Sequence, residues 1–123
     1  MSEVGIVLVS HVPEVVTGIA RLINEVAKDV SVTLAGGTDD DQVGTSFAKI
    51  EKAFNENQSK KLLAFYDLGS AKMNLEMAME LTDKEVTLYD VAFVEGSYTA
   101  AALIQAGASL KEIEGQLAEL VIK

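Results

Sequence analysis

Hydrophobic positions along the chain follow two periods, one typical of buried strands and the other typical of amphipathic helices. Short runs rich in β-branched and other apolar residues, too brief for buried helices, predict four strands, at Val4–Ser10, Val30–Ala35, Leu62–Tyr66 and Glu85–Tyr89. We also expect the chain to stay extended over Val91–Val94. Glycine or polar residues follow these runs, so each strand is predicted to end at a turn.

After each predicted strand, the apolar residues recur at the spacing of an amphipathic helix. Pro13 suits the first turn of a helix, and the apolar stripe that follows it predicts a helix to about Lys28. Apolar stripes or high helix propensity predict four more helices, at Thr45–Asn57, Ala71–Leu81, Ser97–Gln105 and Leu110–Val121. This order is typical of an α/β fold, a three-layer sandwich in which helices cover both faces of a mainly parallel sheet. Because no linker or repeat interrupts it, we predict a single domain over residues 1–123.

The charge balance and the missing cysteine exclude several classes of function. The 123 residues include 10 Lys and Arg against 19 Asp and Glu, which gives a formal net charge of −9. This balance argues against nucleic-acid or anionic-membrane binding, since both depend on clustered basic residues. The lack of cysteine excludes disulfides, thiolate catalysis and Cys-ligated metals. With no recognisable secretory signal and no apolar run long enough to span a membrane, the sequence predicts a cytoplasmic protein.

Polar residues and glycines gather where the predicted strands end. In open parallel sheets, function concentrates outside the carboxyl ends of the strands, at the point where the strand order reverses. The segments expected there are Ser10-His11, Gly36-Gly37-Thr38, Asp67-Leu68-Gly69-Ser70 and Glu95-Gly96-Ser97. A strand order of 2-1-3-4 makes the first and third strands neighbours, which would bring His11 beside Asp67.

His11 is the only histidine, and its position suits a phosphoryl-accepting residue. A helix start favours an anion, and the glycine and hydroxyl residues nearby let backbone amides approach one. Asp67 can accept a hydrogen bond from the Nδ1 proton, which fixes the tautomer and leaves Nε2 free as a nucleophile. The alternative is structural, with His11 as a polar residue at a helix start in a non-catalytic regulatory module.

Other chemistries have weaker support in the sequence. Asp67 could be the phosphoacceptor of a response-regulator receiver, but the acidic residues that hold magnesium there are missing after the first strand. The acidic triplet Asp39–Asp41 is more simply a solvated loop than a metal site. Met73, Met77 and Met79 suit packing or a subunit interface. Without a P-loop or dinucleotide motif we expect no permanently bound cofactor, and phosphate would arrive on another protein.

Four segments carry a family resemblance that extends over essentially the whole chain. They are IVLVSH at 6–11, AGGTDDDQVGTS at 35–46, YDLGSAKMNLEMAMEL at 66–81 and FVEGSYTAA at 93–101. In order and spacing the chain resembles the DhaM family, the phosphotransferase subunits of phosphoenolpyruvate-dependent dihydroxyacetone kinases, whose defining domain is similar to the mannose-type IIA domains of the sugar phosphotransferase system (PTS). Mannose-type domains typically have Thr-His-Gly at the histidine and a tryptophan after the aspartate. Ser10-His11-Val12 and the lack of tryptophan favour the DhaM branch.

The resemblance implies a phosphocarrier with a known set of partners. His11 would accept a phosphoryl group on Nε2 from phospho-HPr, with Asp67 orienting the ring. The segments around the phosphate would contribute Gly36, Gly37, Thr38, Gly69 and Ser70. The phosphoryl group would pass to ADP held on the DhaL subunit, and the ATP formed would phosphorylate dihydroxyacetone on DhaK.

Three further expectations come from the same resemblance. No metal takes part, the protein is a homodimer, and a separate HPr supplies the phosphate, because the sequence ends at Lys123 without an appended HPr-like domain. A mannose-type IIA domain that donates to a IIB protein would look much the same and remains the alternative.

Overall fold

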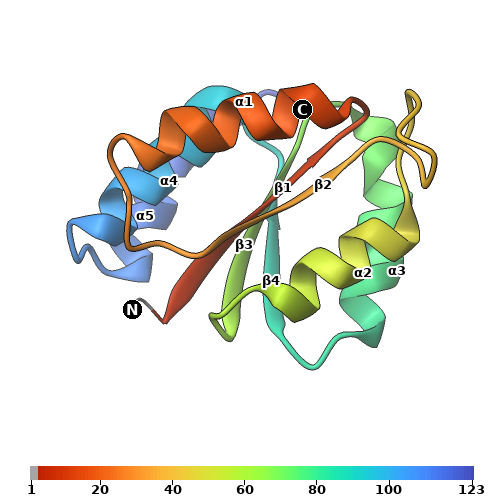
Figure 1. Ribbon diagram of the computed structural model, residues 1–123. Coiled ribbons are helices and arrows are strands. Elements are labelled where there is room, and N and C mark those ends of the chain that lie inside the picture. The colour runs from red at the N-terminus through yellow and green to blue at the C-terminus, as the bar shows by residue number, and fades with distance from the viewer. Residues whose placement is uncertain (1–2) are drawn as a thin grey trace.

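Four parallel strands form the centre of the molecule. The computed structural model describes residues 3–123, so Met1 and Ser2 of the expected domain lie outside the described residues. The strands are β1 (Val4–Ser10), β2 (Val32–Gly36), β3 (Lys61–Tyr66) and β4 (Glu85–Tyr89). Their order in the sheet is β2-β1-β3-β4, and every pair of neighbours is parallel (Figure 1). The predicted parallel sheet and its 2-1-3-4 order are confirmed.

Helices cover both faces of this sheet. They are α1 (Pro13–Asn24), α2 (Phe47–Glu56), α3 (Lys72–Leu81), α4 (Phe93–Gln105) and α5 (Leu110–Leu117), with short 3-10 turns η1 (Gly69–Ala71) and η2 (Ala118–Leu120). Figure 1 shows α1, α4 and α5 on one side of the strands and α2 and α3 on the other. The three-layer sandwich predicted from the sequence is therefore confirmed.

Alternation along the central strands builds two separate cores. Ile6 and Leu8 of β1 face α1, α4 and α5, whereas Val7 and Val9 of the same strand face α2 and α3. All four side chains are fully buried. A strand buried on both faces needs continuous apolar sequence, which is why β1 lacks the polar alternation of a half-exposed strand. Burial on both sides fixes the register of β1 against β3 and hence the position of whatever follows each strand.

The end of the fourth strand differs from the prediction. The chain does not stay extended to Val94, because α4 begins at Phe93. The segment Glu95-Gly96-Ser97 consequently lies inside a helix and not in a loop at the sheet edge. A Cβ on Gly96 would come within 2.4 Å of a Val91 methyl group, so glycine permits close packing of the helix here. The Ser97 hydroxyl donates back to the Phe93 carbonyl at 2.7 Å and does not compete with the helix.

Other boundaries move by a few residues for packing reasons. The first helix ends at Asn24 instead of Lys28, because the chain turns there to bury Ala27 and Val30 before β2 begins. The last helix ends at Leu117, and after η2 Val121 forms an antiparallel bridge with Val91. Over residues 3–123, no helix is both long and apolar enough to cross a membrane.

Candidate active site

The parallel pairing of β1 and β3 places His11 beside Asp67. Val9 lies opposite Tyr66 in the sheet, and the Asp67 amide donates to the Val9 carbonyl at 3.2 Å. One residue beyond each strand, His11 Nδ1 lies 2.8 Å from Asp67 Oδ1. The His11 side chain is 15% exposed and that of Asp67 19%. The structure therefore brings together the two residues for which the sequence predicted catalytic roles.

Asp67 accepts four hydrogen bonds, two on each oxygen. Oδ1 accepts from His11 Nδ1 and, at 2.7 Å, from the Leu68 amide. Oδ2 accepts from the Ser10 hydroxyl at 2.8 Å and from the His11 amide at 3.0 Å. Burial tends to raise the pKa of Asp67, but these hydrogen bonds together outweigh it and lower that pKa below its usual value. Asp67 is therefore ionised at neutral pH.

An ionised partner fixes the tautomer of the imidazole. Because the carboxylate is acceptor-only, Nδ1 must carry the proton, and the lone pair of Nε2 points away from Asp67. Ser70 Oγ lies 2.6 Å from Nε2 and donates to it in this tautomer. Ser70 is exposed, so the hydrogen-bond partner of Nε2 is a hydroxyl at the protein surface.

Ser10 has a role in the site that the sequence analysis did not assign to it. Its side chain is fully buried, donates to Asp67 and accepts from the Val12 amide at 3.1 Å. It thus links the carboxylate to the first residues before α1. A lone hydroxyl directly after a continuous apolar strand was the available signal, since a buried polar group needs defined partners.

The glycine segment at the end of β2 contacts the chain on both sides of His11. The Gly37 amide donates to the Ser10 carbonyl at 3.0 Å, and a Cβ on Gly36 would come within 2.7 Å of Pro13 Cα. Gly37 also has a φ of +78°, a conformation that favours glycine. The Thr38 hydroxyl accepts from the Gln42 amide at 3.0 Å. These contacts hold the start of α1 in place, and a direct role of this segment in phosphate binding stays a prediction.

The loop between β2 and α2 is tied to the site by its backbone. The Gly44 amide donates to the His11 carbonyl at 2.9 Å, and Asn74 of α3 donates to Thr45 at 2.9 Å. Asp39 accepts from Ser46, and Asp41 pairs with Lys49, so two members of the acidic triplet have protein partners. Across residues 3–123, no group of three or more acidic, His or Cys side chains is arranged to hold a metal ion.

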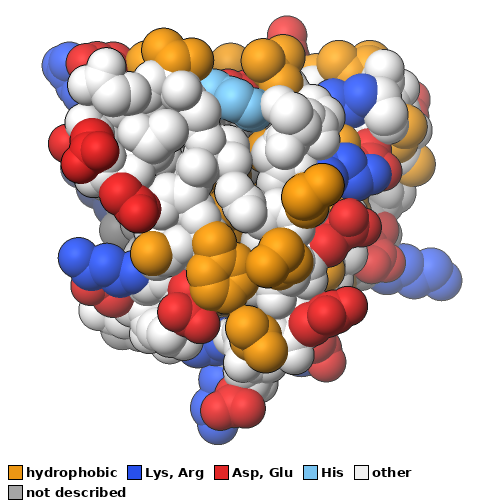
Figure 2. Space-filling view, turned by 90° about the vertical axis from the view of Figure 1, so that its right-hand side faces the viewer, with side chains coloured by type: hydrophobic (Ala, Val, Ile, Leu, Met, Phe, Trp, Pro, Cys, Tyr) orange, Lys and Arg blue, Asp and Glu red, His pale blue; other side chains and the backbone are white. Residues whose placement is uncertain are grey.

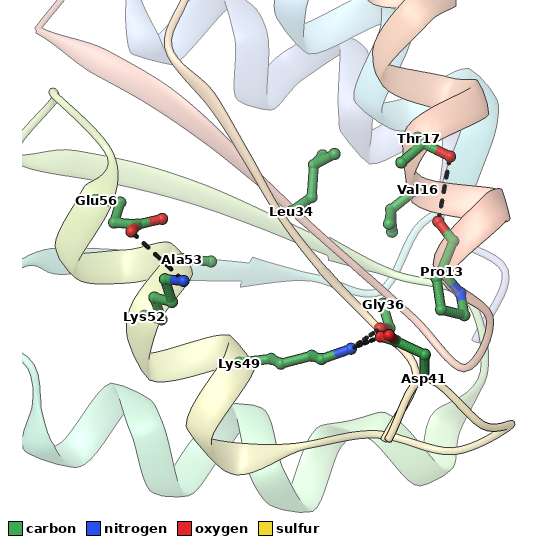
Figure 3. Close-up of a pocket in the computed structure, with 10 residues that line it drawn as sticks. All are labelled: Pro13, Val16, Thr17, Leu34, Gly36, Asp41, Lys49, Lys52, Ala53 and Glu56. Atoms are coloured by element: carbon green, nitrogen blue, oxygen red, sulfur yellow. Dashed lines mark hydrogen bonds and ion pairs between the residues drawn. The ribbon is translucent and has the colours of Figure 1, made fainter. Parts of the chain in front are cut away.

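Lysines approach the predicted loops from elsewhere in the chain. Lys49 of α2 donates to the Gly36 carbonyl at 2.8 Å, beside a cavity of about 270 Å³ along the outer edge of β2 (Figure 3). Neither His11 nor Asp67 lines this cavity. Lys123 donates to the Tyr66 and Asp67 carbonyls. The segments Ser10-His11, Gly36-Gly37-Thr38 and Asp67-Leu68-Gly69-Ser70 contain no basic residue, so sequence alone did not indicate these cations.

Comparison with known proteins identifies the class to which this fold and site belong. The family model EIIA-man, described as the PTS system fructose IIA component, matches residues 5–114. The crystal structure of a protein of unknown function aligns with a TM-score of 0.85 at 28% identity, covering 100% of this chain and 98% of that one. The chain belongs to the EIIA-man family of PTS components.

Curated relatives define the branch within that family. The chain is 49% identical over 119 residues to DhaM of Lactococcus lactis, the phosphotransferase subunit of a PTS-dependent dihydroxyacetone kinase, with 97% of each chain covered. It is 43% identical to a DhaM of Listeria innocua, a phosphoryl donor subunit, covering 97% of this chain and 96% of the relative. That branch is DhaM, which confirms the resemblance seen in the sequence.

Proposed function

We propose that this chain is the phosphocarrier subunit of a phosphoenolpyruvate-dependent dihydroxyacetone kinase and that His11 carries the phosphoryl group. The observation that supports this most directly is the pairing of His11 Nδ1 with an ionised Asp67, which directs the Nε2 lone pair outward. Membership in the DhaM branch adds the reaction, since the relatives are named as phosphotransferase or phosphoryl donor subunits of such kinases.

The chemistry proceeds in two transfers at one nitrogen. The Nε2 lone pair attacks the phosphorus of phospho-HPr, the phosphorus–nitrogen bond to the HPr histidine breaks, and that histidine keeps the electron pair. A β-phosphate oxygen of ADP on the DhaL subunit then attacks the same phosphorus, and the bonding pair returns to Nε2. Throughout, Nδ1 keeps its proton, and Asp67 stabilises the positive charge that the substituted ring carries. The ATP formed phosphorylates dihydroxyacetone on DhaK.

The surroundings of Nε2 suit a protein partner. Exposed apolar side chains lie on the segments next to the site, with Leu68 59% and Met73 73% exposed. The histidine is visible at the edge of the face shown in Figure 2. The net charge of −9 favours encounters with a basic patch on a partner such as HPr, an effect that weakens with salt.

Within residues 3–123, the side chain hydrogen-bonded to Nε2 is the neutral Ser70 hydroxyl and not a basic group. Ser70 would supply a neutral donor, and so would the glycine segments if they bind the phosphate as predicted. Neutral donors hold a phosphoryl group more loosely than a charged clamp does. Loose binding suits a group that must leave again within one cycle. The homodimer and the cytoplasmic location stay predictions. Met73, Met77 and Leu81 form an exposed apolar row on α3 that a second subunit could cover.

Phosphorylation by the purified PTS proteins tests the proposal. We expect incubation with phosphoenolpyruvate, enzyme I and HPr to add one phosphate that is labile in acid and stable in base. Because the chain has a single histidine, His11→Ala removes the only candidate acceptor of this kind. An unmodified wild-type protein, or the same modification on His11→Ala, would contradict the proposal and favour a non-catalytic module.

A second experiment identifies the acceptor. With DhaL, ADP and DhaK present, we expect the labelled phosphate to reach dihydroxyacetone. Transfer to a IIB protein, with none to DhaL-bound ADP, would instead support the mannose-type alternative.

A further inference from the structure

Lys123 brings an ammonium group to the carboxyl end of β3, next to the proposed catalytic pair. Its Nζ donates to the Tyr66 carbonyl at 2.6 Å and to the Asp67 carbonyl at 2.9 Å. The same nitrogen lies 4.3 Å from the centre of the Tyr66 ring, a cation–π distance. Three features of β3 and its end thus converge on one side chain that lies 56 positions from Asp67 in the sequence.

Backbone hydrogen bonds hold the segment that carries Lys123. The Ala92 amide donates to the Leu120 carbonyl at 3.0 Å, and the Ile122 amide donates to the Asp90 carbonyl at 3.2 Å. Between them Val121 forms its antiparallel bridge with the buried Val91. The segment is therefore anchored between the end of β4 and the start of α4, and this anchoring directs Lys123 toward β3.

The charges around Lys123 are paired and come from several elements. Burial lowers the pKa of Lys123, and the carboxylates of Asp67 and Asp90, which follow β3 and β4, partly oppose that shift. Lys72 of α3 lies 3.2 Å from the Asp90 carboxylate, which also accepts from the Tyr66 hydroxyl at 2.5 Å. Burial, Asp90 and Glu76 of α3 together raise the pKa of Tyr66, and His11 contacts the carboxylate of Asp67.

We propose that Lys123 is a positioning residue for phosphoryl transfer at His11, acting through the backbone of Asp67. By binding the two carbonyls on either side of the Asp67 amide, it fixes the peptide from which the carboxylate projects. Its hydrogen bonds go to backbone carbonyls and not to His11, so it does not take part in the chemistry directly. Small displacements of a group that orients a catalytic residue reduce reaction rates strongly, so fixing the backbone of Asp67 can affect the rate of phosphoryl transfer. This inference rests on the proposed carrier function.

Three variants test the role of the ammonium. Lys123→Met keeps the length of the side chain but removes its charge and donors, Lys123→Arg keeps both, and Lys111→Met removes an exposed lysine of α5 as a matched control. We expect Lys123→Met to slow phosphorylation by saturating phospho-HPr about tenfold, the scale of a lost charge-assisted hydrogen bond discounted for exposure. Lys123→Arg restores most of the rate, and Lys111→Met is unchanged.

A pH titration separates positioning from general stability. Lys123 interacts electrostatically with Asp67, so we expect loss of this positive charge to raise the pKa of Asp67. The acid limb of the rate profile should then move to higher pH in Lys123→Met but not in Lys123→Arg or Lys111→Met. Carbon NMR of the Asp67 carboxyl group reports the same shift without any phosphoryl transfer. Circular dichroism establishes that each variant is folded.

Two outcomes would overturn the inference. The first is a Lys123→Met rate and Asp67 titration equal to those of Lys111→Met. The second is equal slowing in Lys123→Met and Lys123→Arg. A wild-type protein that accepts no phosphate would instead overturn the proposed function, and the Asp67 titration would still decide whether Lys123 acts on that carboxylate.

Discussion

The two nitrogens of His11 have opposite surroundings. Nδ1 faces a carboxylate that accepts four hydrogen bonds, one of them from a serine with no exposed surface. Nε2 faces one exposed hydroxyl, with the 59% exposed Leu68 close by in sequence. The difference fits the proposed carrier role of His11, which requires one nitrogen held in a single protonation state and the other free to exchange partners.

The chain builds these two regions from different elements. The Nδ1 side depends on the ends of β1 and β3, whose register is fixed by burial on both faces of the sheet. The Nε2 side depends on η1, a turn of three residues that begins at Gly69. Short 3-10 turns have poorer hydrogen-bond geometry than strand pairs, so the exchangeable side is also the locally weaker one.

The largest effect on phosphoryl transfer is expected when the charged carboxylate next to Nδ1 is replaced. In Asp67→Asn the amide can present its NH2 group to donors that now contact the carboxylate, and the imidazole loses its tautomer restraint. We expect phosphoryl transfer to slow by roughly 10²–10⁴-fold, typical of losing such catalytic support. Stopped-flow or quench measurements with phospho-HPr check this value. Asp40→Asn, in the exposed loop, is the matched control, and equal rates in the two variants would remove Asp67 from the mechanism.

A smaller effect is expected from the buried hydroxyl behind Asp67. Ser10→Ala removes one of the four hydrogen bonds to the carboxylate, so the pKa of Asp67 rises toward its ordinary value. We expect transfer to slow by about tenfold, the scale of one hydrogen bond to a charged group.

The stability of Ser10→Ala gives the same prediction an independent measurement. In the wild type the pKa of Asp67 is lower in the folded than in the unfolded state, so its contribution to the free energy of unfolding is present above the unfolded pKa near 3.8 and is lost as pH falls through the folded pKa. Urea unfolding at pH 7 and pH 3 should therefore show a larger difference between wild type and Ser10→Ala at pH 7. A difference that does not depend on pH would contradict the assigned role.

The smallest effect is expected on the exchangeable side. Ser70→Ala removes the hydroxyl near Nε2, but that hydroxyl must move away in any case when a phosphoryl group arrives. We expect the rate to change by no more than about threefold, because loss of an exposed, neutral hydrogen bond costs little. The measurement is the same transfer assay, with Ser10→Ala as the comparison. A loss larger than that of Ser10→Ala would reverse the contrast between the two nitrogens.

Sequence patterns predict the pair His11 and Asp67 better than the residues that hold this pair in place. The run from Val4 to Ser10 and the turn after Tyr66 identify two strand ends, and the rule for parallel sheets then brings His11 and Asp67 together. The role of Ser10 could not be predicted, because it depends on which oxygen of Asp67 faces its hydroxyl. The position of Lys123 depends on the C-terminal segment, which pairs with Val91 just after β4. This long-range contact has no local signal in the sequence.

The wrong expectation at Glu95-Gly96-Ser97 has a related cause. Glycine and serine are typical of loops, and local propensity favours a turn there. Tertiary packing decides otherwise, because the absent side chain of Gly96 is what allows α4 to lie against Val91.

The bond from the Gly44 amide to the His11 carbonyl has a consequence for recognition. Val43, the neighbouring residue, is 78% exposed and is among the most accessible apolar side chains of the described chain. A partner protein that contacts Val43 would therefore contact a loop that is hydrogen-bonded to the main chain of His11. Under the proposed function, this hydrogen bond would couple partner contact at Val43 to the backbone position of His11.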